Sequence, residues 1–202
     1  MPTIPTHAFL GYAITSPWRR QLEDKKSKWT LTILSLALPV IPDLDAMFMR
    51  WIPYRHPLGH RGLSHSLLFA FLIALVSVLL VPRLRRIFPG KAIGLFLLLF
   101  FITALHGVLD AFTDGGEGIG FFIPFENSRY FFPISPIPVA PLGITGMFSI
   151  YWVISCFIAE FLLLWTIGAG IMVATIKKFR YRWIVSAVLV LIGVLVWIGQ
   201  SI

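Results

Sequence analysis

Long apolar runs separated by short polar segments dominate the chain. A helix needs about 20 mostly apolar residues to cross a hydrocarbon core of about 30 Å. Four runs reach or approach this length: Ser64–Val81, Lys91–Phe112, Phe148–Ile176 and Trp183–Ile198. A fifth run, Trp29–Met49, is long enough, but Pro39 and Pro42 interrupt it, so we expect a helix that unwinds near its far end. The pattern predicts an all-α polytopic membrane bundle of about five spans.

The first apolar run, Ala8–Trp18, is too short to cross a membrane. We interpret it as a short N-terminal helix, half inserted or lying at the interface, with Thr6 as its N-cap. No internal repeat or low-complexity tail divides the chain. We therefore expect a single membrane-embedded domain over residues 1–202, with a motif-bearing core at 1–147 and two C-terminal spans at 148–202.

Composition and charge placement both support a membrane protein. Hydrophobic residues make up 57% of the chain and charged residues 13%, against about 25% charged in an ordinary soluble domain. The formal net charge is +8, and 17 residues are Lys or Arg. Five of them lie in residues 19–28, four in 83–91 and four in 177–182, which leaves four elsewhere. Basic turns of this kind are typical of cytoplasmic loops.

A nucleic-acid partner is not expected, because a binding face would need these charges on one continuous surface. With the basic turns in the cytoplasm, three polar stretches reach the outer rim of the bundle. The broken span delivers Asp43 and Asp45 there, and the second span starts there at His65. The third span rises to the same rim at His106 and Asp110.

The stretch "HGVLDAFTDGG" contains His106 and Asp110, four residues apart and therefore on one face of a helix. An imidazole and a carboxylate so placed can ligate one metal ion, or one can orient the other. An ordinary acidic cap is a poor explanation, because an aspartate is unfavourable at a helix C-terminus. Ionisable groups inside an apolar span usually mark a functional interior site.

The stretch "PVIPDLDAM" offers two further acids, Asp43 and Asp45. After Pro42 we expect extended backbone, in which alternate side chains share a face. Two carboxylates directed at one spot repel each other unless a cation lies between them. The alternative is that both acids simply face water.

The stretch "GHRGLSHS" (residues 59–66) combines His60, Arg61, Ser64 and His65. Ser64 is the predicted N-cap of the second span, and His65 then points into the rim from the first helical turn. The positive end of the helix dipole keeps such a histidine neutral and able to bind a metal. The fork of donors on Arg61 suits an anion such as phosphate. The alternative for Arg61 is an anchor to lipid head groups.

The glycine- and proline-rich loop at residues 113–143 predicts a stiff cover over the outer interface. Its Asp114 and Glu117 are spare carboxylates within reach of a metal site. Glu160 lies midway along the fourth span and should face the bundle interior, without a catalytic role. His56 has no partner at helical spacing and is interpreted as a bystander.

His7, "PDLD", "GHRGLSHS" and "HGVLDAFTDGG…PF…RYFFP", in this order, resemble the bacterial inner-membrane metal-dependent hydrolase family of the LexA-regulated, SOS-induced type. The resemblance covers residues 7–133, and that family is distantly similar to zinc-dependent phospholipase C. It implies a bacterial inner-membrane location. It also implies that metal ligands or their immediate partners are His7, Asp43, His60, His65, His106 and Asp110. Asp45 matches the second acid of the family's Pro-Asp-x-Asp.

These features predict a metal-dependent hydrolase that acts on a phosphate ester of a lipid or lipid-like substrate at the outer, periplasmic side. One or more divalent ions are expected; His and carboxylate donors suit zinc, and manganese and iron fit similar donors. Asp43 or Asp45 would accept the proton of a water molecule, and Arg61 would clamp the phosphate. The expected partners are this substrate and membrane lipids, and no protein partner is expected.

The main alternative is a metal-ion transporter, or a metal-binding membrane protein without hydrolytic activity. A transporter should carry ionisable residues at several depths along its spans, whereas only Glu160 lies deep in this sequence. An intramembrane metalloprotease would show His-Glu-x-x-His, which is absent. The sequence also lacks the Lys and Arg-Pro element and the Ser-Gly-His element of lipid phosphatases with a histidine nucleophile.

Overall fold

Local sequence signals set the starts of the main helices. α3 (Lys25–Ala37) begins after Asp24, whose carboxylate accepts a hydrogen bond from the Ser27 N–H. α4 (Leu67–Leu80) begins after Ser66, whose hydroxyl accepts one from the Phe69 N–H. Both caps satisfy N–H groups that the helix itself leaves unpaired. Ser66, not the predicted Ser64, is therefore the N-cap of the second apolar helix.

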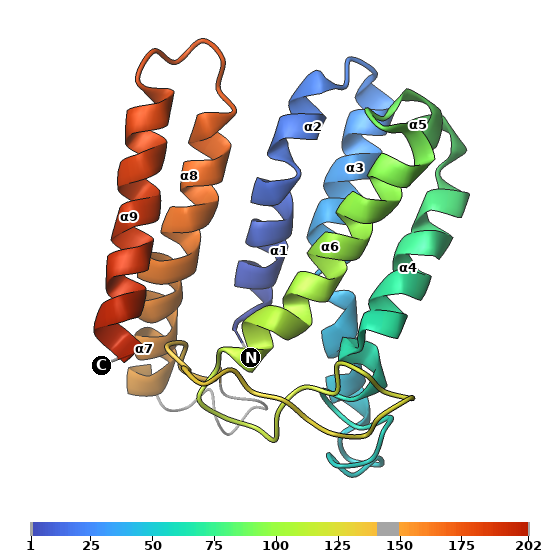
Figure 1. Ribbon diagram of the computed structural model, residues 1–202, viewed down its shortest axis with the longest axis vertical. Coiled ribbons are helices and arrows are strands. Elements are labelled where there is room, and N and C mark those ends of the chain that lie inside the picture. The colour runs from blue at the N-terminus through green and yellow to red at the C-terminus, as the bar shows by residue number, and fades with distance from the viewer. Residues whose placement is uncertain (1, 141–149, 202) are drawn as a thin grey trace.

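In the computed structural model, which describes residues 2–140 and 150–201, the helices lie side by side (Figure 1). The remaining elements are α1 (Ile4–Ile14), α2 (Ser16–Gln21), η1 (Ile41–Phe48), η2 (Leu63–His65), α5 (Pro82–Ile87), α6 (Lys91–Ala111), α7 (Ile150–Glu160), η4 (Phe161–Trp165), α8 (Thr166–Ala174) and α9 (Arg182–Ser201). No strand forms within the described ranges, only two isolated bridges in the loop after α6. The all-α prediction is confirmed.

Among the described residues, fewer helices are long and apolar enough to cross a membrane than the five spans predicted. α6 qualifies, as does the continuous stretch Ile154–Ala174, and α3 with η1 makes a third if this pair, bent by 43°, is one span. α4 has 14 residues, a rise of about 21 Å, because Ser66 caps it late and Pro82 follows its end. Within α9, the apolar stretch Arg182–Val196 is also short.

The N-terminal helix lies inside the bundle, which corrects the prediction of a half-inserted or interfacial helix. α1 starts at Ile4 with Thr3 at the N-cap position, so Thr6 lies in its first turn. It packs against α3, α6 and α8. A Cβ on Gly11 would lie 2.3 Å from the Ser35 carbonyl oxygen, so only glycine allows α1 and α3 to approach this closely.

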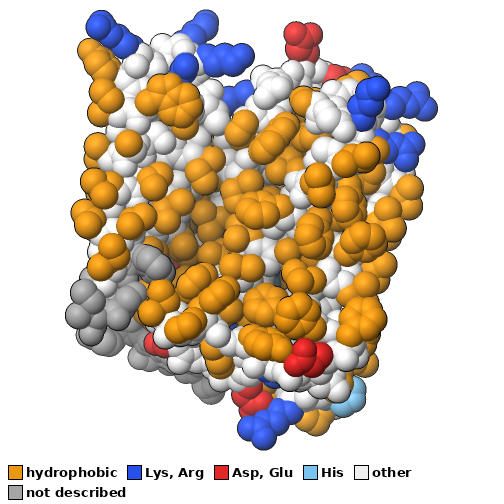
Figure 2. All heavy atoms as spheres, viewed as in Figure 1, with side chains coloured by type: hydrophobic (Ala, Val, Ile, Leu, Met, Phe, Trp, Pro, Cys, Tyr) orange, Lys and Arg blue, Asp and Glu red, His pale blue; other side chains and the backbone are white. Residues whose placement is uncertain are grey.

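Two apolar clusters hold the bundle together. The larger joins α3, α4, α5 and α6 through residues such as Leu31, Ala74 and Leu99. The smaller joins α1 and the end of α6 to η4, through residues such as Leu10 and Leu163. On the face drawn in Figure 2, apolar side chains also cover the flank between the two ends of the bundle. This surface suits contact with lipid chains.

The two ends of the bundle differ. One, the basic end, carries the basic turns predicted from the sequence (Figure 2). The other, the site end, carries the start of α1, the end of α6 and the loop at residues 112–140 (Figure 1). This loop returns to α6, where the Phe132 N–H donates to the Ala111 carbonyl oxygen at 3.0 Å. The rest of the predicted cover, and the predicted boundary at 147/148, lie outside the described residues.

Candidate metal centre

The predicted ligand residues converge at the site end. They come from α1, η1, the segment 59–66 and α6, which lie far apart in the chain. All are buried, with an exposed fraction of 6% or less: His7, Asp43, His60, His65, His106 and Asp110. The structure therefore brings together every ligand that the resemblance implied, and shields them from bulk water.

Four side chains form the tightest group: Asp43, His65, His106 and Asp110, with donor atoms within 4.8 Å of one another. The Nε2 atoms of His65 and His106 face each other at 3.0 Å. Asp43 Oδ1 lies 3.3 Å from His106 Nε2 and 3.6 Å from His65 Nε2. Asp110 Oδ2 lies 3.7 Å from His65 Nε2. The predicted pairing of His106 and Asp110 on one face of a helix is confirmed.

The hydrogen bonds around this group leave a lone pair on His106 and the oxygens of both aspartates available to a metal ion. His106 Nδ1 lies 2.7 Å from the Pro39 carbonyl oxygen and must donate to it, so Nε2 keeps its lone pair for the site. Both carboxylate oxygens of Asp43 and of Asp110 are buried without a hydrogen-bond partner. Buried oxygens in this state are unfavourable. A divalent cation among them satisfies all four side chains, so the residues fit a metal ion, and the His and carboxylate donors suit zinc.

His7 reaches the other side of the Asp110 carboxylate. Its Nε2 lies 3.3 Å from Asp110 Oδ1, and its ring stacks on His106 with centroids 4.0 Å apart. Both ring nitrogens of His7 are buried without a hydrogen-bond partner. The position of His7 along the sequence does not fix the end of the bundle that it reaches, and the structure places it at the site end.

A second group adjoins the first: Asp45, His60 and His65. Asp45 Oδ1 lies 2.6 Å from His60 Nδ1, and Asp45 Oδ2 lies 3.3 Å from His65 Nδ1. Asp45 also accepts hydrogen bonds from the Arg61 N–H at 3.2 Å and from the Ser64 hydroxyl. Asp45 is thus saturated with partners and orients two histidines, in contrast to Asp43.

His65 belongs to both groups and lies outside the long apolar helices. Burial alone would lower the pKa of His65, but the carboxylates of Asp43 and Asp45 beside its two ring nitrogens outweigh burial and raise it to about 9. The ring therefore carries a proton when no metal ion is bound. This corrects the prediction of a neutral His65 in the first turn of the span, because His65 lies in η2, before the N-cap of α4. The surrounding carboxylates favour positive charge at this position.

The backbone around Asp43 and Asp45 is not extended, as predicted, but a 3-10 helix, η1. The two carboxylates therefore do not share a face. They lie at opposite nitrogens of His65, with Asp43 near Nε2 and Asp45 near Nδ1. The alternative that both acids face water is wrong, because Asp43 is buried and Asp45 is hydrogen-bonded within the site.

Arg61 lies in the interior rather than at the lipid surface. Its backbone has a φ of 62°, which is unusual for a residue other than glycine. Its Nε lies 3.2 Å from Asp110 Oδ2. Nη1 donates to the Gly115 carbonyl oxygen at 2.6 Å and Nη2 to the Thr113 hydroxyl at 3.1 Å. Arg61 thus joins Asp110 to the start of the covering loop, and its predicted role as a phosphate clamp stays a prediction.

Some residues that support the site were missed by the sequence analysis. Arg129 donates to the carbonyl oxygens of Tyr54 at 2.7 Å and His60 at 3.0 Å, and so fixes the loop against the segment that carries His60. Ser64 and Pro39 hold Asp45 and His106. Several of these contacts use backbone carbonyl groups, which no sequence motif reveals.

The spare polar residues take structural roles. Asp114 accepts a hydrogen bond from the Val139 N–H at 2.7 Å, and Glu117 pairs with Arg55 at 2.9 Å on the surface. Neither belongs to the two ligand groups, which agrees with their interpretation as spare carboxylates rather than ligands. His56 is exposed and also lies outside both groups.

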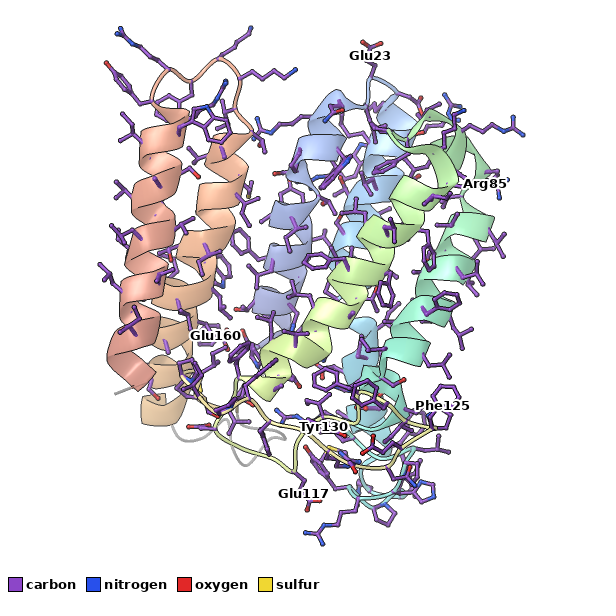
Figure 3. All side chains as sticks on the ribbon, viewed as in Figure 1. Glu23, Arg85, Glu117, Phe125, Tyr130 and Glu160 are labelled. Carbon is purple, nitrogen blue, oxygen red and sulfur yellow. The ribbon has the colours of Figure 1, made fainter. Side chains whose placement is uncertain are left out.

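Glu160 faces the interior, as predicted, and is fully buried. Its carboxylate accepts hydrogen bonds from the Thr3 N–H at 2.7 Å and from the hydroxyls of Thr3 and Thr6, both at 2.5 Å. Figure 3 shows Glu160 beside the start of α1. It therefore fixes the helical turn from which His7 reaches the metal centre.

The fold and the site together define a helical membrane protein with a buried cluster of histidines and aspartates at one end. The chain belongs to the YdjM inner membrane protein family, which it matches over residues 1–200. It is 34% identical over 146 residues to "Inner membrane protein YbcI" of Escherichia coli (strain K12), which covers 72% of this chain and 80% of that protein. No solved structure matches the chain. The predicted inner-membrane class is confirmed.

Proposed function

We propose that the protein is a membrane-embedded, metal-dependent hydrolase of phosphate esters. The observation that supports this most directly is the buried group of Asp43, His65, His106 and Asp110. Its imidazole nitrogens face each other, and its carboxylate oxygens have no hydrogen-bond partner. Such a site favours a bound cation, and a site of histidines and aspartates is typical of hydrolytic metal centres.

The residues around the group have distinct roles in this proposal. A bound divalent ion would supply Lewis acidity, which acidifies water and stabilises negative charge on a phosphate oxygen. Asp45 orients His60 and His65. The assignment of Asp43 or Asp45 as the proton acceptor for a water molecule stays a prediction. Arg61 holds Asp110 in place, and His7 contacts the other oxygen of the same carboxylate.

An apolar pocket beside the site supports a lipid or lipid-like substrate. It has a volume of about 320 Å³ and is lined by Leu67, Leu68, Phe71, Phe100, Phe121, Phe122, Ile123 and Phe125. A Cβ on Gly107 would lie 3.0 Å from the His65 carbonyl oxygen and 3.3 Å from the Phe121 ring, so the pocket wall and the site pack on the same turn of α6. Phe125 is exposed on the covering loop at the site end (Figure 3). An acyl chain in this pocket would remain in contact with the bilayer.

The arrangement favours hydrolysis over ion transport. Both ligand groups found among the described residues lie at the site end, and Glu160 is hydrogen-bonded to the threonines of α1. A transport path would need ionisable groups at successive depths toward the other end. With the basic turns in the cytoplasm, the site would face the periplasm.

The test is to purify the full-length protein and measure its metal content by elemental analysis. Hydrolysis of a panel of phospholipids and phosphodiesters is then measured with and without a chelator. We expect His65→Ala and Asp110→Ala to lose both the metal and the activity, while the exposed His56→Ala keeps both. Unchanged metal content in either ligand variant would refute the site. Metal-dependent uptake into proteoliposomes without hydrolysis would identify a transporter instead.

A further inference from the structure

The basic end contains a buried arginine without a counter-charge. Arg19 is 7% exposed, and its guanidinium lies 3.2 Å from the centroid of the Tyr12 ring. Nη2 donates to the Tyr12 carbonyl oxygen at 2.8 Å, while Nε and Nη1 are buried without a hydrogen-bond partner. An unpaired buried cation is strongly unfavourable, so this position favours an anionic partner.

The protein itself does not supply that anion among the residues described. Among the described residues no carboxylate forms an ion pair with Arg19, and the adjacent Arg20 carries a like charge. Asp24 is already paired with Arg83 at 2.6 Å. Glu23 points away from the bundle at the turn between α2 and α3 (Figure 3). The partner of Arg19 must therefore come from outside the described chain.

Two pockets adjoin at this position and share Arg20. One, of about 230 Å³, is lined by Arg19, Arg20 and Lys28 together with Tyr12 and Ser16. The other, of about 540 Å³, is lined by Arg20, Lys177, Lys178, Arg182 and Trp183. No acidic residue lines either pocket. The pair forms a basic site between α2 and the α8–α9 hairpin, at the end that Figure 2 shows rich in Lys and Arg.

The remaining walls suit an amphiphilic ligand. The hydroxyls of Ser16 and Thr175 lie 3.5 Å apart, one on each side of the site, and can hydrogen-bond an oxyanion. Ala174, Ile176 and Met172 make apolar walls. The ligand class therefore combines a negatively charged head with an apolar tail.

We propose that the two pockets bind the phosphate head group of an anionic phospholipid, with Arg19 and Arg20 as its main contacts. The arginine fork matches phosphate oxygens, and basic pockets between membrane helices are known to hold anionic lipid head groups. This site lies at the opposite end from the candidate metal centre and does not depend on hydrolysis. The lipid would join α2 to the C-terminal hairpin.

The experiment is native mass spectrometry of the full-length protein released from non-ionic detergent. The probes are phosphatidylglycerol and phosphatidylcholine of equal chain length, and inorganic phosphate. Three variants each lose two positive charges. Arg19→Gln/Arg20→Gln removes the main contacts, and Lys177→Gln/Lys178→Gln removes exposed lysines at the rim. Arg85→Gln/Arg86→Gln, on α5 at the same end, is the matched control.

We expect the wild type to prefer phosphatidylglycerol to phosphatidylcholine. The arginine pair should weaken phosphatidylglycerol binding about tenfold or more, the lysine pair should weaken it several-fold, and the control pair should leave it nearly unchanged. If the arginine variant does not fold, the exposed lysine pair decides the question. An equal loss in the control pair, no preference for the anionic lipid, or full displacement by inorganic phosphate would overturn the proposal.

Discussion

Each end of the bundle contains a buried arginine, and the two arginines differ in their partners. At the site end, Arg61 pairs with Asp110 and donates to the covering loop. At the basic end, Arg19 is also buried, and among the described residues its guanidinium contacts the ring and the carbonyl group of Tyr12 but no carboxylate. The same residue type is an ion-pair partner at the site end and a charge without a described counter-charge at the basic end. The difference shows that the available counter-charge, not burial alone, decides what a buried arginine does.

The two ends also differ in the charge of the ligand that each favours. Asp43 and Asp110 have buried carboxylate oxygens that accept no hydrogen bond at the site end, so that end favours a cation. Arg19 leaves N–H donors unpaired at the basic end, so that end favours an anion. Each end should therefore respond to a different ligand, and the responses should be separable.

The largest expected effect is that of metal removal on the site end. At a free ion concentration of 1,000 times its Kd, chelation should lower the free energy of unfolding by about 4 kcal/mol. Thermal unfolding of the detergent-solubilised protein measures this change. His106→Ala should no longer respond to the chelator, whereas Arg19→Gln/Arg20→Gln should respond as the wild type does. An equal chelator effect in His106→Ala and the wild type would contradict the assignment of the site.

A direct test of the comparison is to replace each buried arginine with glutamine. Arg61→Gln leaves the Asp110 carboxylate without its partner and should reduce the free energy of unfolding by about 3 kcal/mol, the lower end of the range for breaking a buried ion pair. Arg19→Gln leaves no carboxylate without its partner. Measured without anionic lipid, it should therefore reduce the free energy of unfolding clearly less than Arg61→Gln does. Denaturant unfolding of both variants in the same detergent measures the difference. Equal losses would show that the ends do not differ in this way.

Local signals in the sequence were sufficient for part of the site. The spacing of His106 and Asp110 placed both on one helix face, because helical periodicity is a local property. The spacing of Asp43 and Asp45 misled, since two residues apart can share a face only in extended backbone, and η1 is a 3-10 helix. The different positions of Asp43 and Asp45 depend on their contacts with His65 and His60, which are distant in sequence.

The parts of the fold that the sequence did not predict depend on tertiary packing. As residue types, Ser64 and Ser66 are equally suitable N-caps. In the structure the Ser64 hydroxyl donates to Asp45, and Ser66 caps α4 two residues later. That shift helps to make α4 too short for the predicted span. Arg19 looked like one more residue of a basic turn, and its burial follows from the packing of α2 against α3 and α8.

A smaller effect is expected from Glu160, which connects the C-terminal helices to the site end. Glu160→Ala leaves the donors of Thr3 and Thr6 unpaired and should cost about 2 kcal/mol of unfolding free energy. It should also weaken metal binding several-fold, because His7 lies in the turn that Glu160 fixes. Metal titration and thermal unfolding measure the two effects, with the exposed Glu117→Ala as control. A stability loss with unchanged metal affinity would limit Glu160 to a structural role.

The smallest expected effect separates helix capping from site chemistry in two neighbouring serines. Ser66→Ala removes the cap of α4 and should cost about 1 kcal/mol, with metal content unchanged, because its hydroxyl bonds only the Phe69 N–H among the described contacts. Ser64→Ala removes a donor to Asp45 and should instead alter metal affinity. Thermal unfolding and metal titration of both variants give the comparison. If Ser64→Ala destabilised the fold without changing metal affinity, Asp45 would not be part of the metal centre's support.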